Sequence, residues 1–370
     1  MALSAGIVGL PNVGKSTLFN ALTKSSVPAQ NYPFCTIDPH AAITFVPDER
    51  LGILKKLYQS QEIIPATMTF VDIAGLVKGA AAGQGLGNQF LSHIREVDLI
   101  IHVLRCFHDE NITHVSGAID PLADFETIVA ELMLKDLESL QKRQAKLESL
   151  IKAAQQKPKE LKELLAEQEV LNAVKIAIDR TDAHAVRSLI SQSTVQTIPL
   201  LSAKKFIIVA NIAESELENE AWQNNPHYQT LVKTFGADRV IPLCARLEHE
   251  LSQLSDEERA TMMAAMNVSV SGLDRVIRLA YEHLGLITFF TCGPKEIHAW
   301  PIRKGISVRQ ASGEIHSDLE KGFICAEVLN YHDLLALGSE VKAKTMGKIA
   351  TQGQEYIVQD GDIIHVRFNV

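Results

Sequence analysis

Cysteine is scarce in this sequence, and the features that mark secreted or membrane proteins are absent from it. The chain has 370 residues but only five cysteines, and none is spaced as C-x-x-C. This disfavours a disulfide framework or a structural zinc site and indicates reduced thiols. No apolar run approaches the roughly 18–20 residues that span a bilayer, and residues 1–10 lack the charged and long apolar regions of a signal peptide. We therefore expect a cytoplasmic protein that does not enter a membrane.

Basic residues are outnumbered by acidic ones. Lys and Arg total 36 and Asp and Glu total 44, so the formal net charge is −8, and the pI is about 5.9. This balance argues against a protein that coats nucleic acid or an anionic membrane through its overall charge. The remaining composition, 46% hydrophobic and 22% charged, is that of a folded globular protein. At about 100–200 residues per domain, the length predicts two or three domains.

Short apolar runs alternate with helical patterns in much of the chain, which predicts an α/β fold. A run at residues 5–10 leads into a glycine-containing loop, and a helical pattern follows at residues 16–24. Further buried strands are expected at residues 68–72, 99–104, 206–210 and 240–243. Ligands of such sheets bind at the carboxyl ends of the strands.

Residues 124–182 differ from the segments on either side, because they contain no glycine and no strand pattern. Aliphatic residues recur there at helical spacing in two series, with Pro158 between the series. We predict two long antiparallel helices joined by a turn and inserted into the α/β domain. The region of the turn carries four lysines, Lys152, Lys157, Lys159 and Lys162. Their pattern is typical of a solvated turn, and the alternative is a basic finger that contacts RNA or an acidic protein.

The last part of the chain, from about residue 287, is rich in strand patterns. Modest helical pieces and glycine turns separate five short runs, at residues 287–291, 297–302, 324–328, 356–358 and 363–368. This pattern predicts a small α+β domain of roughly 80 residues.

A glycine-rich motif for phosphate binding follows the first predicted strand. The segment GLPNVGKS at residues 9–16 matches G-x-x-x-x-G-K-[ST] between a strand and a helix, which is the context that the motif requires. Backbone N–H groups and the helix N-terminus then face the phosphate oxygens. Lys15 is expected to reach the β- and γ-phosphates, and the Ser16 hydroxyl is a candidate ligand for Mg²⁺.

Two further segments carry candidate sensors of the γ-phosphate. Asp72 ends a predicted strand in the sequence Asp-Ile-Ala-Gly, so it can hold Mg²⁺ through water, and the Gly75 N–H can contact the γ-phosphate. Thr36, in the loop after the first helix, is a candidate Mg²⁺ ligand. The glycine-rich stretch that begins at Gly75 is typical of a segment that becomes ordered when the γ-phosphate is present.

The segment expected to recognise the base departs from the guanine-specific pattern Asn-Lys-x-Asp. After a predicted strand the chain reads Asn211-Ile-Ala-Glu214. In the guanine pattern the aspartate accepts hydrogen bonds from N1 and N2 of the base, and adenine cannot donate them. A longer carboxylate, and Ile212 in place of lysine, favour adenine or relaxed selectivity over guanine. Asn211 is expected either to contact the purine edge or to brace the phosphate loop, and backbone groups of Cys244 and Ala245 to complete the pocket.

The residue that usually orients the attacking water is absent. Many GTPases have a glutamine directly after the D-x-x-G glycine, whereas this chain has Leu76, so intrinsic turnover is expected to be slow. Asn12 is a candidate ligand for a monovalent cation such as K⁺, acting where an arginine finger would. His114 is a candidate general base or water-orienting residue, the alternative being an ordinary loop histidine. A partner is a third source of the missing group.

These segments resemble the Obg group of translation-factor-like GTPases. The resemblance lies in GLPNVGKST at residues 9–17, NYPFCT at 31–36 and DIAGLVKG at 72–79. Asn211-x-x-Glu214 narrows it to the YchF subfamily, the Obg-like ATPases. GEIHSDLEKGF at residues 313–323 and DGDIIHVRF at residues 360–368 are similar to that family's TGS domain, a small β-grasp module. The resemblance covers essentially the whole chain.

The resemblance implies an α/β P-loop NTPase with a Ras-like G domain, an inserted helical coiled-coil hairpin and a C-terminal TGS domain. The expected boundaries are 1–123 and 200–284 for the G domain, 124–199 for the insertion and 285–370 for the TGS domain. Hydrolysis of ATP with Mg²⁺ and a link to oxidative stress are also implied. The implied partner is the ribosome or a ribosomal subunit, contacted at rRNA or ribosomal protein through the hairpin and the TGS domain. Neither a membrane nor a specific DNA sequence is expected as a partner.

The resemblance also implies roles for particular residues. Carried over by position, the phosphates are bound by Asn12, Val13, Gly14, Lys15, Ser16 and Thr17, and the base site is lined by Asn211, Ile212 and Glu214. Gly75, Cys244 and Ala245 complete the expected nucleotide site. Ser16, Thr36 and Asp72 are the implied Mg²⁺ ligands, and catalysis is assigned to Lys15 and to His114, which lies where the family is thought to keep a catalytic histidine. One departure is Arg246, a bulky charged residue where a small one is expected.

Two other functions are consistent with parts of the sequence. The first is an Obg-type GTPase that assists ribosome assembly, and Ile212 and Glu214 argue against it directly. The second is a ribosome-binding module that nucleotide gates and in which hydrolysis is incidental, a reading that Leu76 favours. Preference between ATP and GTP tests the first alternative, and stimulation of turnover by ribosomes tests the second.

Overall fold

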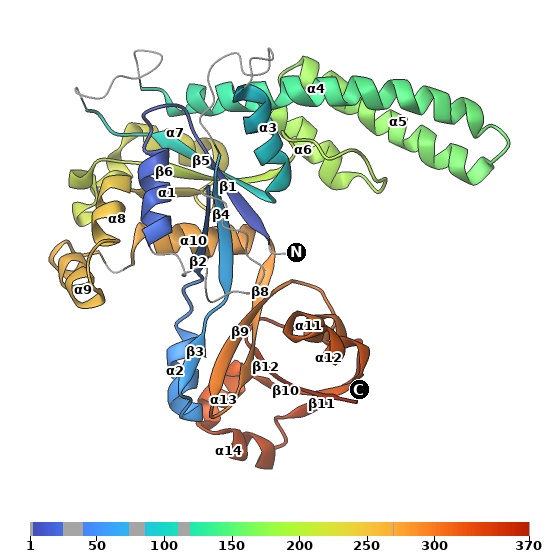
Figure 1. Cartoon of the computed structure of the whole chain (residues 1–370). Coiled ribbons are helices and arrows are strands. Elements are labelled where there is room, and N and C mark those ends of the chain that lie inside the picture. The colour runs from blue at the N-terminus through green and yellow to red at the C-terminus, as the bar shows by residue number, and fades with distance from the viewer. Residues whose placement is uncertain (1–2, 25–39, 74–85, 110–118, 269, 370) are drawn as a thin grey trace.

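The computed structural model describes residues 3–24, 40–73, 86–109, 119–268 and 270–369. A six-stranded sheet with the strand order β2-β4-β1-β5-β6-β7 forms the centre of the first domain (Figure 1). Every neighbouring pair is parallel except β2 and β4, which are antiparallel. The strands are β1 (Ser4–Val8), β2 (Ala41–Phe45), β4 (Thr67–Asp72), β5 (Leu99–Arg105), β6 (Lys205–Asn211) and β7 (Val240–Leu243). The predicted parallel α/β sheet is confirmed.

Both faces of this sheet are covered by helices. All seven residues of β5 are buried, and alternate side chains enter two separate clusters. Leu99, Ile101 and Val103 pack with α1 (Lys15–Lys24) and α10 (Gly272–His283), while Ile100 and Leu104 pack with the opposite layer. That layer consists of α3 (Leu86–Glu96), α7 (Pro226–Phe235) and the start of α4 (Pro121–Ala153). A strand that is buried on both faces has a continuous apolar sequence, which is why β5 was predicted from sequence.

The inserted segment forms the predicted helical hairpin. Helix α4 runs for 33 residues from its N-cap Asp120, and α5 (Pro158–Asp179) returns beside it, with Pro158 in its first turn. Arg143 of α4 donates two hydrogen bonds of 2.7 Å to the Glu167 carboxylate of α5. Helix α6 (Ala183–Gln192) follows, and Figure 1 shows the hairpin projecting from the sheet. In the part of the chain that the structure describes, no helix is apolar enough over a sufficient length to cross a membrane.

A second six-stranded sheet, with the order β11-β10-β12-β8-β9-β3, forms the C-terminal domain. Its strands are β8 (Leu286–Cys292), β9 (Glu296–Arg303), β10 (Phe323–Asn330), β11 (Ala350–Gln352), β12 (Asp362–Phe368) and β3 (Glu62–Ile64). Four helices connect them, α11 (Val308–Ile315), α12 (Ser317–Lys321), α13 (Tyr331–Leu337) and α14 (Glu340–Thr345). The predicted strand at residues 356–358 is wrong: Ile357 makes only an isolated bridge to Ser307.

One edge of the C-terminal sheet comes from the N-terminal part of the chain. Strand β3 pairs in parallel with β9, with Glu62 opposite Glu296. It is preceded by α2 (Arg50–Tyr58), and the Ser60 hydroxyl donates a 2.6 Å hydrogen bond to the Gly293 carbonyl. Residues 1–123 were predicted to belong to the first domain as one stretch, whereas α2 and β3 pack with the second.

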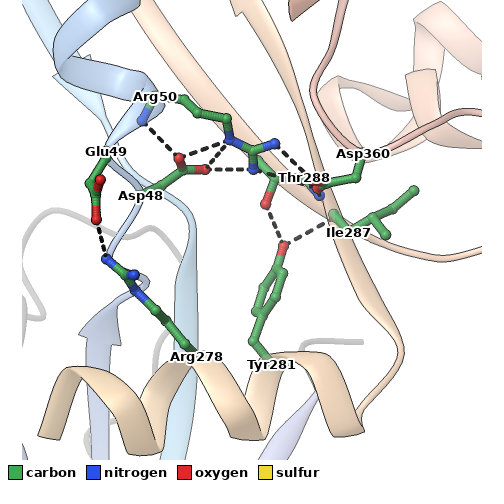
Figure 2. A network of polar contacts seen from close by, with 8 residues as sticks. All are labelled: Asp48, Glu49, Arg50, Arg278, Tyr281, Ile287, Thr288 and Asp360. Carbon is green, nitrogen blue, oxygen red and sulfur yellow. Dashed lines mark hydrogen bonds and ion pairs between the residues drawn. The ribbon is translucent and has the colours of Figure 1, made fainter. Parts of the chain in front are cut away.

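A polar network joins the two domains where β2 leads into α2 (Figure 2). Arg50 donates to Asp48 at 2.9 Å and to Asp360 of the C-terminal domain at 2.7 Å. Burial acts to lower the pKa of the Arg50 guanidinium, but its hydrogen bonds to Asp48 and Asp360 outweigh burial and raise that pKa. Tyr281 of α10 donates at 3.0 Å to the Ile287 carbonyl. Charged groups and directional hydrogen bonds therefore hold the two domains together at this contact.

The remaining helices of the first domain are short. They are α8 (Ala245–Leu251), α9 (Asp256–Ala265), and the 3₁₀ helices η3 (Glu214–Glu216) and η4 (Glu218–Asn224). Helix α8 packs beside α1, and η3 follows β6 directly. They place the residues after β6 and β7 next to the glycine loop after β1.

Candidate functional site

The glycine-rich loop joins the end of β1 to the start of α1 and has a conformation that requires glycine at Gly14. Its φ is +96°, and a Cβ there would lie 2.2 Å from the Asn211 Nδ2 atom. Asn12 also has a positive φ, of 65°, and Val13 is buried, so its side chain anchors the loop in the core. The Leu18 N–H donates to the Gly14 carbonyl at 3.0 Å, which joins the loop to the first turn of α1. The loop thus presents a helix N-terminus, which attracts anions.

A cation and an anion face each other beside this loop. The Lys15 ammonium donates to the Asp72 carboxylate, and their side chains are only 11% and 18% exposed. Asp72 ends β4 next to β1, so strand pairing brings the two residues together. The Ser16 hydroxyl belongs to the same turn of α1 as Lys15 and is exposed.

These residues fit a divalent cation. In the Lys15–Asp72 pair, the Asp72 carboxylate already binds a cationic group beside the loop. An aspartate and a serine hydroxyl are hard oxygen ligands of the kind that Mg²⁺ prefers. The third predicted ligand, Thr36, lies outside the described residues, as do Gly75, Leu76 and His114. In the described ranges there is no cluster of three or more His, Cys, Asp or Glu side chains that could hold a metal by itself.

Asn211 braces the phosphate loop. Its Nδ2 atom donates to the Val13 carbonyl at 2.8 Å, and its Oδ1 atom accepts from the Ala245 N–H at 3.0 Å. The side chain is 4% exposed, so these two bonds are shielded from water. Of the two roles that the sequence left open for Asn211, the geometry supports bracing. Asn211 ties the loop after β1 to the start of α8.

A cavity of about 480 Å³ opens between these segments. Eight residues assigned to the nucleotide site from the sequence line it, together with Arg246: Asn12, Gly14, Thr17, Asn211, Ile212, Glu214, Cys244 and Ala245. Ile212 contributes little surface, since it is only 1% exposed. Three segments associated from sequence, the glycine-rich loop, the base segment and the residues after β7, therefore meet around one hollow at the carboxyl ends of β1, β6 and β7.

One wall of this cavity, formed by Phe107, His108 and Asp109 after β5, was not predicted from the sequence. Buried Arg105 holds this wall, because its guanidinium donates to the carbonyls of Phe107 and Asp109 at 3.1 Å each. The guanidinium carbon also lies 4.7 Å from the centre of the Phe107 ring. The available signal was position: in a parallel sheet, the residues directly after a central strand lie at the ligand edge.

The acidic group in the base segment is free to interact. Glu214 begins η3 and is exposed, and no group in the described part of the chain donates a hydrogen bond to its carboxylate. Arg246, the departure noted from sequence, is 80% exposed and pairs with Glu250 at 3.0 Å on the next turn of α8. Arg246 lines the cavity from its exposed rim, and its guanidinium also attracts the Glu214 carboxylate.

The cysteines near the site are not activated. Burial raises the pKa of the Cys244 thiol and that of the Cys106 thiol. Thiolates are the reactive species, so these two groups behave as small apolar residues at neutral pH. Cys35 lies outside the described residues.

A glycine loop between a buried strand and a helix, a lysine paired with the aspartate of a neighbouring strand, and an asparagine that braces the loop define a P-loop nucleotide-binding protein of the GTPase fold. A sequence model described as 50S ribosome-binding GTPase (MMR_HSR1) matches residues 4–146. A second one, YchF-GTPase_C, described as a protein of unknown function (DUF933), matches residues 286–369.

Known proteins resemble the chain over its full length. The ribosome-binding ATPase YchF of Bacillus subtilis is 46% identical over 375 residues, which covers 100% of both chains. Obg-like ATPase 1 of Oryza sativa is 43% identical over 100% of this chain and 92% of its own length. The solved structure of the Schizosaccharomyces pombe YchF GTPase matches with a TM-score of 0.83 and 38% identity, over 99% of this chain and 97% of that one. The chain belongs to the YchF family.

Proposed function

We propose that the protein is a Mg²⁺-dependent ATPase that acts as a nucleotide-controlled switch on the ribosome and regulates translation or a stress response in the cytoplasm. The observation that carries the proposal is the base segment: the free Glu214 carboxylate borders the cavity, Ile212 replaces the usual lysine, and Asn211 is committed to bracing. The names of the relatives support both parts, since the B. subtilis protein is called a ribosome-binding ATPase.

The phosphate side of the site has the groups that hydrolysis needs. Lys15 would leave Asp72 to bind the β- and γ-phosphates, and Asp72 and Ser16 would then hold Mg²⁺. The ion would neutralise charge on the phosphates. Thr36 as a further ligand, Gly75 as a γ-phosphate contact and His114 as the water-orienting residue belong to the same proposal. A monovalent cation at Asn12, such as K⁺, would complete the charge stabilisation.

Adenine selectivity follows from the length and position of the Glu214 side chain. A carboxylate at this edge can accept a hydrogen bond from the adenine 6-amino group. Guanine has a carbonyl oxygen at that position, which would meet the carboxylate as a second acceptor. A site that leaves a polar group unpaired against the wrong base discriminates strongly. The proposal therefore predicts tighter binding of ATP than of GTP.

Glu214→Asp is expected to shrink the preference for ATP over GTP by about tenfold, because the shorter carboxylate moves toward the guanine arrangement. The measurement is equilibrium binding of non-hydrolysable ATP and GTP analogues. Ile212→Lys is added only in a second step, since a lysine at this buried position costs stability. Glu257→Asp, on the exposed side of α9, is the matched control and should leave both affinities unchanged. A wild-type protein that prefers GTP would favour the Obg-type GTPase.

Ribosomes are expected to raise the ATP turnover of the wild-type protein by about tenfold or more, because a partner can supply the water-orienting group that the leucine at position 76 does not provide. We propose the helical hairpin and the C-terminal domain as the contact surfaces. The exposed lysines at the hairpin tip, of which Lys157 pairs with Glu160 at 2.9 Å, make a basic finger available there. Phosphate release with and without purified ribosomes measures the effect. Turnover that ribosomes leave unchanged would indicate a binding module with incidental hydrolysis.

A further inference from the structure

We propose that Asn225 is a positioning residue for the base pocket: its buried amide fixes two walls of the cavity that it does not itself line. The inference rests on the proposed nucleotide function, because it assigns a role within that same site. Asn225 lies between η4 and α7, and its N–H donates to the Trp222 carbonyl at 3.0 Å.

Every hydrogen-bonding position of this amide is occupied. Its Nδ2 atom donates to the Cys106 carbonyl at 2.9 Å and to Glu216 Oε1 at 2.7 Å. Its Oδ1 atom accepts from the N–H groups of His227 and Tyr228 at 2.9 and 3.0 Å, which caps α7. The residue is 6% exposed, so water cannot replace these partners. The amide therefore has a single orientation.

The two groups that receive the Nδ2 hydrogens belong to different walls of the cavity. Cys106 directly precedes Phe107, His108 and Asp109, the wall that follows β5. Glu216 ends η3, and its other carboxylate oxygen, Oε2, accepts from the Ala213 N–H at 2.9 Å. This holds the turn in which Glu214 borders the cavity. The Asn225 amide thus sets the distance between the wall that follows β5 and the Glu214 carboxylate.

Helix capping alone does not account for an asparagine here. The cap uses only the Oδ1 atom, and aspartate or serine caps a helix as well as asparagine does. The two N–H bonds toward Cys106 and Glu216 have no part in capping. They are the feature that only asparagine supplies among the good capping residues.

The phosphate side is held by different contacts. Asn211 braces Val13, and Lys15 pairs with Asp72, and neither contact involves Asn225. Loss of the Asn225 bridge should therefore loosen the base walls and leave the phosphate groups in place. The KM for ATP should rise while kcat changes little, a division that a general loss of folded protein does not produce.

Asn225→Asp tests the inference, because aspartate keeps the cap and removes both donors. We expect the KM for ATP to rise about tenfold, kcat to stay within about twofold, and the preference for ATP over GTP to shrink. The matched control is Asn330→Asp. Asn330 also caps a helix, α13, through the His332 N–H at 2.9 Å, and it also bonds a carboxylate, that of Asp362. Asn330 lies in the C-terminal domain, so the KM of the Asn330→Asp variant for ATP should stay at the wild-type value.

The reciprocal change provides a rescue. In the Glu216→Gln, Asn225→Asp double variant, the new glutamine can donate to the new aspartate and still accept from the Ala213 N–H. We expect the double variant to recover part of the lost affinity, because the Glu216 contact is restored while the Cys106 carbonyl still lacks a donor, and Glu216→Gln alone to lose affinity. Equal KM values for Asn225→Asp and Asn330→Asp, or the absence of rescue, would overturn the inference. If the wild-type protein instead prefers GTP, the proposed ATPase function fails, and the same comparison made with GTP still tests the role of Asn225.

Discussion

Replacing Lys15 with methionine is expected to lower kcat for ATP by about two to three orders of magnitude. Removal of one preorganised electrostatic contact to a developing charge typically costs this much. Lys15 already lies at the head of the loop, because the Asp72 carboxylate holds its ammonium there in a setting with little solvent, and it would pass to the phosphates when nucleotide and Mg²⁺ bind. Methionine fills a similar volume but brings no charge. Phosphate release under saturating ATP and Mg²⁺ measures the effect.

The control for this experiment lies on the same helix. Lys24→Met removes an equal charge from the exposed end of α1, away from Asp72, and should leave turnover unchanged. A loss of less than about tenfold in Lys15→Met would contradict the assignment of Lys15 to the phosphates. Lys15→Met mixed with ribosomes also measures the ATP hydrolysis that contaminants of the ribosome preparation contribute.

Replacing Asn211 with alanine is expected to lower the free energy of opening of α1 and the phosphate loop by about 2–4 kcal/mol. The change leaves the Val13 carbonyl and the Ala245 N–H buried without a partner, and each such group costs about 1–3 kcal/mol. Amide hydrogen exchange in α1 is the suitable measurement, since a chain with two sheets need not unfold in one step. Nucleotide affinity should fall together with the protection of these amides.

Asn172→Ala serves as the control for this second experiment. Asn172 also accepts a side-chain hydrogen bond, from Gln144 at 2.8 Å, but it is exposed on the hairpin. Water replaces that bond, so exchange in α1 should stay within about 0.5 kcal/mol of wild type. Unchanged exchange in Asn211→Ala would mean that the loop keeps its conformation without the brace.

Local patterns in the sequence were sufficient for much of the fold. Residues 99–104 form a continuous apolar run, and the structure has β5 there because a central parallel strand is buried on both faces. Pro158 marks the start of α5, since proline suits the first turn of a helix. By contrast, β2 was not predicted. It is a short edge strand in which three of the five residues are partly or fully exposed, so its sequence does not have the pattern of a buried strand.

The site was predictable where a motif sets the backbone and less so where distant contacts decide the outcome. Gly14 and Lys15 follow from the motif, and the structure gives the loop the expected glycine-dependent geometry. The bracing role of Asn211 depends on partners far along the chain, which one sequence does not identify. The wall at Phe107 was missed for a similar reason, because Arg105 shapes it through backbone carbonyls that carry no sequence signal.

The strand β3 has a consequence for how the chain assembles during synthesis. Its partner β9 lies near the opposite end of the sequence, so β3 leaves the ribosome long before β9 exists. Until then the segment between β2 and β4 has no sheet to join, and the first domain must form around a protruding loop. The converse holds for a fragment that begins at Leu286. Its β9 would present an open edge, and such edges promote association between chains. The C-terminal domain is thus complete only when both ends of one polypeptide are available to it.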